Sequence, residues 1–207
     1  MKIAGVILMG GKARRLNGVQ KTHLQIGNTS CFERVVSRLE GNVEEIALSL
    51  ASEDQLFATK AQYSVIYDDL KRPKLEGIPA ALLSIMNWAQ LNLFDQVITT
   101  TGDTPFLPEA YVSELTERIS HDVIIDAPIV SVSNGRIHGL HALWPLASLS
   151  KLKWMLTGDT CPSMSEIHAQ LGSSHHHFAV TSHDPFMNIN TQRDYSIARN
   201  LAETHTL

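Results

Sequence analysis

This sequence has few features of a secreted or membrane-bound protein. Its 207 residues include only 2 cysteines, Cys31 and Cys161, too few for a disulfide framework or a structural zinc site. No apolar run approaches the roughly 20 residues that cross a bilayer, and the apolar start is followed by Lys and Arg rather than by a cleavage site. We therefore expect a cytoplasmic protein.

The sequence also lacks a strong excess of charge of either sign. Its formal net charge is −4 at pH 7, so we expect neither nucleic acid nor a membrane as a partner. Positive charge that binds a ligand must then be local, which suits a small anionic molecule. The length is typical of one well-cored domain, and no Gly/Ser- or Pro-rich linker divides the chain, so we expect a single domain over residues 1–207.

Positive charge is concentrated directly after the first apolar run. Residues 3–9 are short, rich in Ile and Val, and stopped by Gly10 and Gly11, which is typical of a buried parallel strand that opens into a loop. Glycines let backbone N–H groups approach an anion closely, and ligands of open α/β sheets bind at such strand ends. The basic residues within reach of this loop are Lys12, Arg14, Arg15 and Lys21. The pattern indicates a polyphosphate-binding loop.

The spacing of this loop differs from the two commonest phosphate-binding motifs. It has neither the Gly-x4-Gly-Lys-Ser/Thr of a Walker loop nor the Gly-x-Gly-x-x-Gly of a dinucleotide site. A Gly-Gly turn can also be nothing more than a turn. The arrangement that resembles the signature loop of nucleotidyltransferases, which wraps the triphosphate of an incoming nucleotide, is Leu8-Met9-Gly10-Gly11-x3-Arg15-Leu16-x-Gly18-x2-Lys21.

Strand-like and helix-like segments alternate along the chain. This alternation predicts a three-layer α/β/α fold around a mostly parallel, doubly wound, Rossmann-like sheet. We expect strands at 3–9, 44–50, 63–67, 95–101, 123–132 and 136–144. We expect helices at 31–40, 53–61, 77–92, 108–119, 146–156, 163–171 and 191–203, the last capped by Asn190 or Thr191. Segment 172–185 is expected to be weakly structured or to lie at an edge.

A second polar signal follows a later apolar segment. The β-branched run 97–101 ends in Gly102-Asp103, and Pro105 two residues on prevents the strand from continuing. Asp103 is therefore expected at the sheet edge that the first loop also occupies. A carboxylate there suits Mg²⁺, which takes most of its other ligands from water and substrate phosphates. The alternative is an Asp that caps the helix beginning near Pro108.

Together these motifs resemble the molybdenum cofactor guanylyltransferases, the molybdopterin-guanine dinucleotide biosynthesis protein A family of the nucleotidyltransferase superfamily. The resemblance covers nearly the whole chain in order and spacing, at residues 7–21, at 68–86 with Leu75-Glu76-Gly77-Ile78, and at 102–108, 140–143 and 186–191. It implies a fold of the nucleotide-diphospho-sugar transferase type. It also implies an Mg²⁺-dependent enzyme that transfers GMP from GTP to molybdopterin and releases pyrophosphate, with cofactor-delivery proteins and molybdoenzymes as further partners.

The resemblance also implies roles for individual residues. Arg15 and Lys21 would neutralise the triphosphate and Asp103 would bind Mg²⁺, so these three are the implied catalytic residues. The implied nucleotide-binding residues are Leu8, Met9, Gly10, Gly11, Lys21, Ser49, Asp68, Gly77 and Asp103. The implied residues on the pterin side are Asn188, Asn190 and His141, and for His141 a satisfied hydrogen bond in the core is the alternative.

Three departures from the family's pattern keep other functions open. Asp159-Thr160-Cys161 stands where the family often has basic residues after the helix near Gly158. Gln20 stands where the family usually has an acidic residue, and Ser49 stands where it has an Asn that contacts guanine. A cytidylyltransferase of the same cofactor or a sugar-phosphate nucleotidylyltransferase would share the loop and Asp103, and so would a catalytically silent GTP-binding domain. A metal site at residues 175–177 is not predicted, because consecutive residues of a strand point to alternate faces.

Overall fold

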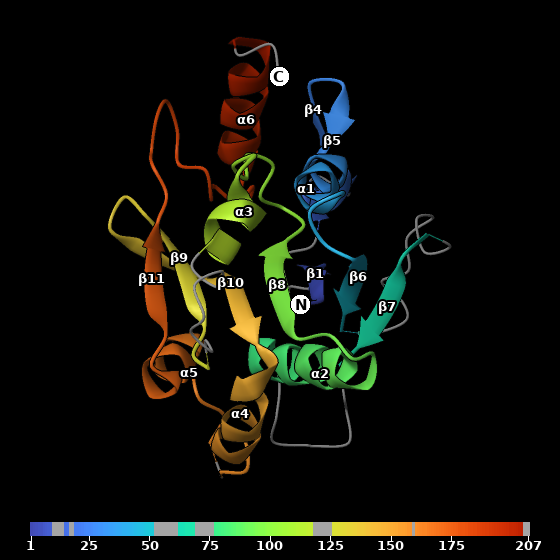
Figure 1. Ribbon diagram of the computed structural model, residues 1–207. Helices are drawn as coiled ribbons and strands as arrows, with labels where there is room; N and C mark the ends of the chain where they lie inside the picture. Colours follow the sequence, from blue (N-terminus) through green and yellow to red (C-terminus); the bar gives the residue numbers. More distant parts are fainter. Residues whose placement is uncertain are drawn as a thin grey trace.

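A seven-stranded sheet passes through the centre of the chain, in the strand order β11-β9-β10-β8-β1-β6-β7. The computed structural model describes residues 1–9, 15–16, 19–51, 62–68, 77–117, 126–158 and 160–204. Helices cover both faces of the sheet, as Figure 1 shows. The predicted three-layer α/β/α fold is confirmed.

Most strands of the central sheet run parallel, as predicted. The strands are β1 (Ile3–Leu8), β6 (Glu45–Leu50), β7 (Ser64–Tyr67), β8 (Gln96–Thr101), β9 (Ile129–Ser133), β10 (Arg136–Pro145) and β11 (Ser174–His177). β10 is antiparallel to both of its neighbours, β8 and β9, whereas the other pairs of neighbours are parallel. Two short hairpins that the sequence did not predict are β2 (Arg15–Leu16) with β3 (Val19–Gln20) and β4 (Gln25–Ile26) with β5 (Thr29–Ser30).

The helices agree with the prediction except in their bounds. They are α1 (Cys31–Leu39), α2 (Ile78–Leu91), α3 (Tyr111–Thr116), α4 (Leu149–Met155), α5 (Met164–Leu171) and α6 (Gln192–Thr204), with short 3-10 helices η1 (Lys21–His23) and η5 (Leu146–Ser148). The helix predicted at 108–119 is shorter, and the one at 146–156 begins with η5. The helix predicted at 53–61 lies outside the described residues.

The apolar run of β1 is buried on both faces, which is why it does not alternate with polar residues. Ala4, Val6 and Leu8 face the core formed with α2, α4 and α5, whereas Ile3 and Ile7 face the core formed with α1 and α3. This period of two assigns successive side chains to opposite layers. The helix layers on the two sides of the sheet therefore share one central strand.

Local sequence explains where the chain turns. α1 begins with a capping box in which Ser30 and Glu33 bond each other's backbone N–H groups. β9 and β10 are joined through Asn134 and Gly135, both at positive φ (47° and 73°), as a tight hairpin turn requires. β9 begins at Ile129 rather than at 123, and residues 118–125 lie outside the described part.

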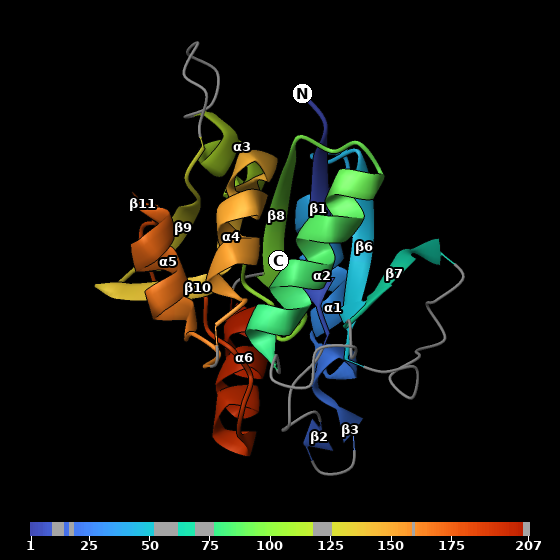
Figure 2. The same ribbon diagram turned by 90° about the horizontal axis from the view of Figure 1, so that it is seen from below.

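β11 forms within the segment expected to be weak or at an edge, and it is an edge strand of the sheet. At the end of the sheet opposite the N-terminus, α6 and the β2–β3 hairpin lie near each other (Figure 2). This is the end at which β1 finishes. Among the described helices, none is both long and apolar enough to cross a membrane.

Candidate active site

The carboxyl ends of four parallel strands meet at one edge of the sheet. Leu8, the last residue of β1, pairs in register with Ser49 of β6 and with Thr101 of β8. Asp68 follows β7 directly, and its N–H donates to the Leu50 carbonyl at 3.2 Å. Residues that are far apart in the sequence thus form one row at the predicted ligand edge.

Gly102 allows the close packing at the base of this edge. Its N–H donates to the Leu8 carbonyl at 3.1 Å. A Cβ at this position would lie 2.8 Å from Met9 Sδ and 2.9 Å from Thr22 Cγ2, closer than real Cβ contacts allow. Glycine is therefore required where β8 turns toward Asp103, because any side chain would push η1 and the end of β1 apart.

Asp103 is held by an amide from the C-terminal part of the chain. Asn188 Nδ2 donates to Asp103 Oδ1 at 2.8 Å and lies 3.1 Å from the hydroxyl oxygens of Thr101 and Thr104. The Ile189 N–H also donates to the Asp103 carbonyl at 3.0 Å. The structure therefore brings together the predicted metal residue and a predicted pterin-side residue.

Lys21 makes the second link between the two halves of the site. Its Nζ donates to Asn190 Oδ1 at 2.7 Å, and the residue is only 6% exposed. This amide is neutral, so it positions the ammonium group without cancelling its charge. Thr191 caps α6, as predicted: its hydroxyl accepts from the Asp194 N–H at 3.2 Å, and Asp194 Oδ2 accepts from the N–H groups of Asn190 and Thr191.

Two buried polar side chains lie at the other end of the row. Ser49 is 3% exposed. Among the described residues, Asp68 Oδ1 is buried without a hydrogen-bond partner, and burial raises the pKa of this carboxyl group. An unpartnered buried acceptor is costly for folding, so this oxygen is a candidate to accept a hydrogen bond from a ligand. Gly77, the N-cap of α2, has φ 69°, which suits glycine.

The oxygen donors near Asp103 fit a hard divalent cation better than a zinc-type ion. Asp103 supplies a carboxylate oxygen, and amides and hydroxyls surround it. Across the described residues, no group of three or more His, Cys, Asp or Glu side chains could hold a metal ion by itself. This chemistry suits an ion such as Mg²⁺, which keeps several ligands for water and substrate phosphates.

A hydrogen-bonded chain that the sequence did not predict anchors the loop that carries Asn188. Ser133 Oγ donates to Asp184 Oδ1 at 2.6 Å and lies 2.7 Å from His138 Nε2. Because the Ser133 proton points to Asp184, His138 Nε2 must carry its own proton and donate to Ser133. Asp184 Oδ1 also accepts from the Phe186 N–H at 2.9 Å, and the rings of Phe186 and His138 stack at 4.6 Å. This chain fixes Phe186, two residues before Asn188.

His141 occupies the core rather than the open edge. It is 3% exposed, its Nδ1 lies 3.1 Å from Thr100 Oγ1, and the Phe186 ring lies 5.0 Å away. Burial lowers the pKa of His141 to about 3, so the imidazole is neutral at physiological pH. These surroundings fit the alternative stated for His141, a satisfied hydrogen bond in the core, and its role on the pterin side stays a prediction.

Part of the predicted loop lies outside the described residues. This applies to Gly10, Gly11, Lys12 and Arg14. For Arg15 the structure describes the backbone, which pairs with Gln20 in the β2–β3 hairpin. The roles inferred for these residues stay predictions. In β11, His176 pairs with Glu114 at 2.7 Å, which gives this histidine a structural partner.

Comparisons with known proteins agree with this geometry. The family model described as a MobA-like NTP transferase domain matches residues 5–177. A molybdenum cofactor guanylyltransferase from Acidiphilium cryptum (strain JF-5) is 35% identical over 95% of this chain and 93% of its own. One from Mesorhizobium japonicum (strain LMG 29417 / CECT 9101 / MAFF 303099) is 31% identical over 99% of this chain and 98% of its own.

Solved structures support the fold. The molybdopterin-guanine dinucleotide biosynthesis protein A from Archaeoglobus fulgidus superposes with a TM-score of 0.66 at 19% identity, over 99% of this chain and 100% of its own. A nucleotidyl transferase from Methanothermobacter thermautotroptrophicus superposes with a TM-score of 0.72 at 17% identity, over 98% of each chain.

The fold and the row of residues at its strand ends define a nucleotidyltransferase. Within that class, the chain belongs to the MobA-like NTP transferases, in the family of molybdenum cofactor guanylyltransferases.

Proposed function

We propose that this protein transfers GMP from GTP to molybdopterin and releases pyrophosphate, acting as one nucleotidyltransferase domain over residues 1–207. The main support for this proposal is a pair of hydrogen bonds that join residues expected to bind the nucleotide to residues expected to bind the acceptor. Asp103 bonds Asn188, and Lys21 bonds Asn190, at 2.8 and 2.7 Å. A phosphate-binding side and an acceptor side that share hydrogen bonds can align two reactants at a single phosphorus atom.

The reaction needs alignment and charge neutralisation more than proton transfer. The terminal phosphate of molybdopterin is already ionised, so its oxygen can attack the α-phosphorus of GTP without a general base. A bond forms between that oxygen and the α-phosphorus, and the bond to the bridging oxygen breaks. Pyrophosphate leaves with the electron pair of the broken bond.

Each residue has a role in this scheme. Lys21 and Arg15 bind the triphosphate and neutralise the charge of the leaving pyrophosphate. Asp103 holds Mg²⁺, which when bound would supply positive charge at the phosphates. Ser49 and Asp68 receive the base and sugar side of the nucleotide, together with the backbone at Leu8, Met9 and Gly77. Asn188 and Asn190 orient the pterin phosphate.

A second candidate is transfer of another nucleotide, and the observation behind it is Ser49. A single hydroxyl can make fewer hydrogen bonds to a base than an amide can. With fewer base contacts, CTP or ATP would compete better with GTP.

Pyrophosphate release tests both candidates and the silent domain. The protein with Mg²⁺ is mixed with GTP, CTP or ATP, with and without molybdopterin. We expect release only with GTP and molybdopterin together, and its loss in Asp103→Asn. Release with CTP in preference to GTP would identify the second candidate. GTP binding without release in any mixture would identify a silent domain.

A further inference from the structure

A hollow separate from the strand-end row lies between α1 and two loops. Its volume is about 440 Å³, and it is lined by Arg34 and Arg38 of α1 and by residues 105–109 and 181–183. None of the residues assigned above to the nucleotide or the acceptor lines it. The size lies within the range of pockets that take small molecules.

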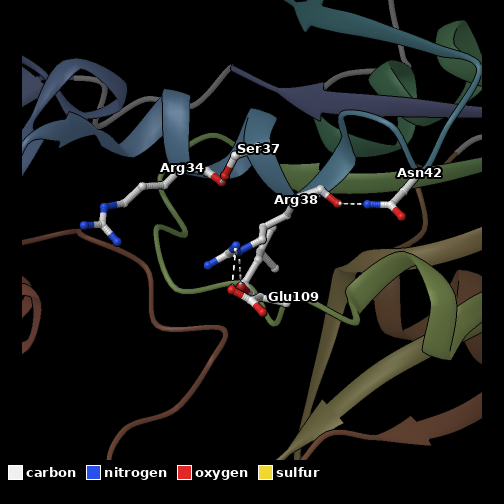
Figure 3. A network of polar contacts seen from close by, with 6 residues as sticks. Arg34, Ser37, Arg38, Asn42 and Glu109 are labelled. Carbon is white, nitrogen blue, oxygen red and sulfur yellow. Dashed lines mark hydrogen bonds and ion pairs between the residues drawn. The ribbon is translucent and has the colours of Figure 1, made fainter. Parts of the chain in front are cut away.

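Two anchored guanidinium groups face this hollow. Arg34 and Arg38 are four residues apart on α1 and both line the hollow; the Arg38 side chain extends toward Glu109, whereas that of Arg34 points away from it (Figure 3). Arg34 Nε and Nη2 donate to the Ile26 carbonyl at 3.1 and 2.8 Å, and Arg38 Nε donates to the Leu107 carbonyl at 3.1 Å. Carbonyl oxygens hold both groups in place without neutralising them.

The positive charge here is only partly compensated. Arg38 Nη1 bonds Glu109 Oε1 at 3.3 Å, and the Glu109 side chain is 84% exposed, so this ion pair is weak. Burial and the positive charge of Arg38 lower the pKa of Arg34. Two arginines against one glutamate leave one net positive charge, in a chain whose overall charge is −4.

The remaining walls are largely apolar. Pro105, Phe106, Leu107 and Pro108 form one side, and the rings of Phe106 and His183 pack in a T-shaped arrangement with their centroids 4.6 Å apart. An occupant therefore needs one negative charge and an apolar body.

We propose that this hollow binds a small organic carboxylate, with its charged group between Arg34 and Arg38 and its apolar body against Phe106. A guanidinium presents paired N–H donors that match the two oxygens of a carboxylate. Because both arginines are already anchored, little side-chain entropy is lost on binding. A polyanion such as phosphate fits less well, since Glu109 repels charge beyond the first unit.

The walls of the hollow lead directly to the active site. The loop at 105–109 follows Asp103, and the segment at 181–183 precedes Asp184, which anchors Phe186. A bound acid would bridge these two segments and change turnover. This effect on turnover rests on the proposed function, whereas the binding itself does not.

Phenylacetate is a suitable probe, and phenylacetamide is its neutral counterpart of the same shape. We expect ligand-observed NMR with the full chain to give a Kd on the order of 1–10 mM for phenylacetate. The amide and inorganic phosphate should bind at least about fivefold more weakly. Lys21→Ala, which removes a cation of the active site, should leave phenylacetate binding unchanged.

Substitutions assign the binding to this hollow. Arg34→Gln and Arg38→Gln should each weaken phenylacetate binding at least about fivefold, whereas Arg199→Gln, an exposed arginine paired with Glu203, should not. Glu109→Gln carries little folding risk, because the side chain is exposed, and it should tighten binding about threefold by adding one net positive charge.

Several results would overturn the proposal: equal binding of the acid and its amide, tighter binding of phosphate, or no change in Glu109→Gln. If the chain transfers no GMP but binds phenylacetate in this Arg-dependent way, only the effect on turnover is lost. If turnover occurs and phenylacetate does not bind, the proposed function stands and the carboxylate site does not.

Discussion

The buried polar groups at the strand-end row and the buried histidines beyond β8 differ in their hydrogen bonding, although Ser131 Oγ of β9 is also buried without a partner among the described residues. In the β7-β6-β1-β8 half, Asp68 Oδ1 and Thr22 Oγ1 are buried with no hydrogen-bond partner among the described residues. In the β10-β9-β11 half, His138 and His141 are each bonded, and His168 lies 2.9 Å from both Ser173 Oγ and the Gly139 carbonyl. Asp68 and Thr22 can therefore accept a hydrogen bond from a ligand, whereas these three histidines already have partners.

This difference separates binding residues from scaffold residues better than residue type does. Histidine is a frequent catalytic residue, yet the buried histidines here hold strands and loops together. An aspartate directly after a strand, with a buried oxygen that has no hydrogen-bond partner, is the stronger sign of a substrate site. Substitutions on the two sides should therefore have different kinds of effect.

Asp103→Asn should have the largest effect. The amide has nearly the same volume and can still meet Asn188, but it is a poor ligand for Mg²⁺. We expect a loss of at least about 10²-fold in the rate of pyrophosphate release, with the melting temperature nearly unchanged. A rate close to the native one at millimolar Mg²⁺ would remove Asp103 from the metal site.

Lys21→Ala should follow. A charge-assisted hydrogen bond contributes about 1.5–3 kcal/mol, so kcat/KM for GTP should fall roughly 10- to 100-fold. The matched control is Lys151→Ala, an exposed lysine on α4, which should leave the steady-state kinetics unchanged. Equal losses in the two variants would mean that a general positive field, rather than Lys21, attracts the nucleotide.

The same comparison with Arg15→Ala and Lys12→Ala tests the predicted order of the loop residues, in which Arg15→Ala lowers kcat/KM for GTP more than Lys12→Ala does.

Ser133→Ala tests whether the second half positions the acceptor. It breaks both hydrogen bonds of Ser133 and should raise the KM for molybdopterin about tenfold, with the KM for GTP unchanged. If Ser133 acts by positioning Asn188, adding Ser133→Ala to Asn188→Ala should raise the KM for molybdopterin little further. Additive losses in this double-mutant cycle would show that Ser133 only stabilises the fold.

Acid should destabilise the second half through its neutral histidines. His141 has a pKa of about 3 in the folded chain and an ordinary value of 6.5 when unfolded, so the unfolded chain binds the extra proton between these values. Stability is full above pH 6.5 and falls by up to about 1.4 kcal/mol per pH unit as the pH drops toward 3. The free energy of unfolding, measured with urea across this pH range, should change less with pH in His141→Gln than in the native chain.

Ser49→Asn should have the smallest effect. A neutral hydrogen bond contributes about 0.5–1.5 kcal/mol, so an added amide should raise the ratio of GTP to ATP affinity by at most about tenfold. An unchanged ratio in calorimetric titrations would show that Ser49 does not face the base.

The sequence predicted the site in the β7-β6-β1-β8 part of the sheet better than the hydrogen bonds in the β10-β9-β11 part. The apolar run of β1 and the Gly102-Asp103 stop are local signals, so both the strand ends and their polar residues could be read from the chain. The contact between Ser133 and Asp184 spans 51 positions and exists only after β9 and the later loop pack together. β11 has no apolar residue, and its pairing with β9 rather than any periodicity forms the strand.

The most direct test of the central claim compares one polar group from each half. Asp68→Asn removes the charge of a carboxylate whose Oδ1 is buried without a hydrogen-bond partner among the described residues, and His168→Gln alters a histidine whose two ring nitrogens both have partners. Calorimetric titration of GTP with Mg²⁺ should show weaker binding in Asp68→Asn, about tenfold, with an equal or higher melting temperature. His168→Gln should melt at a lower temperature and bind GTP as the native chain does. Native GTP affinity in Asp68→Asn, together with weakened affinity in His168→Gln, would contradict the account.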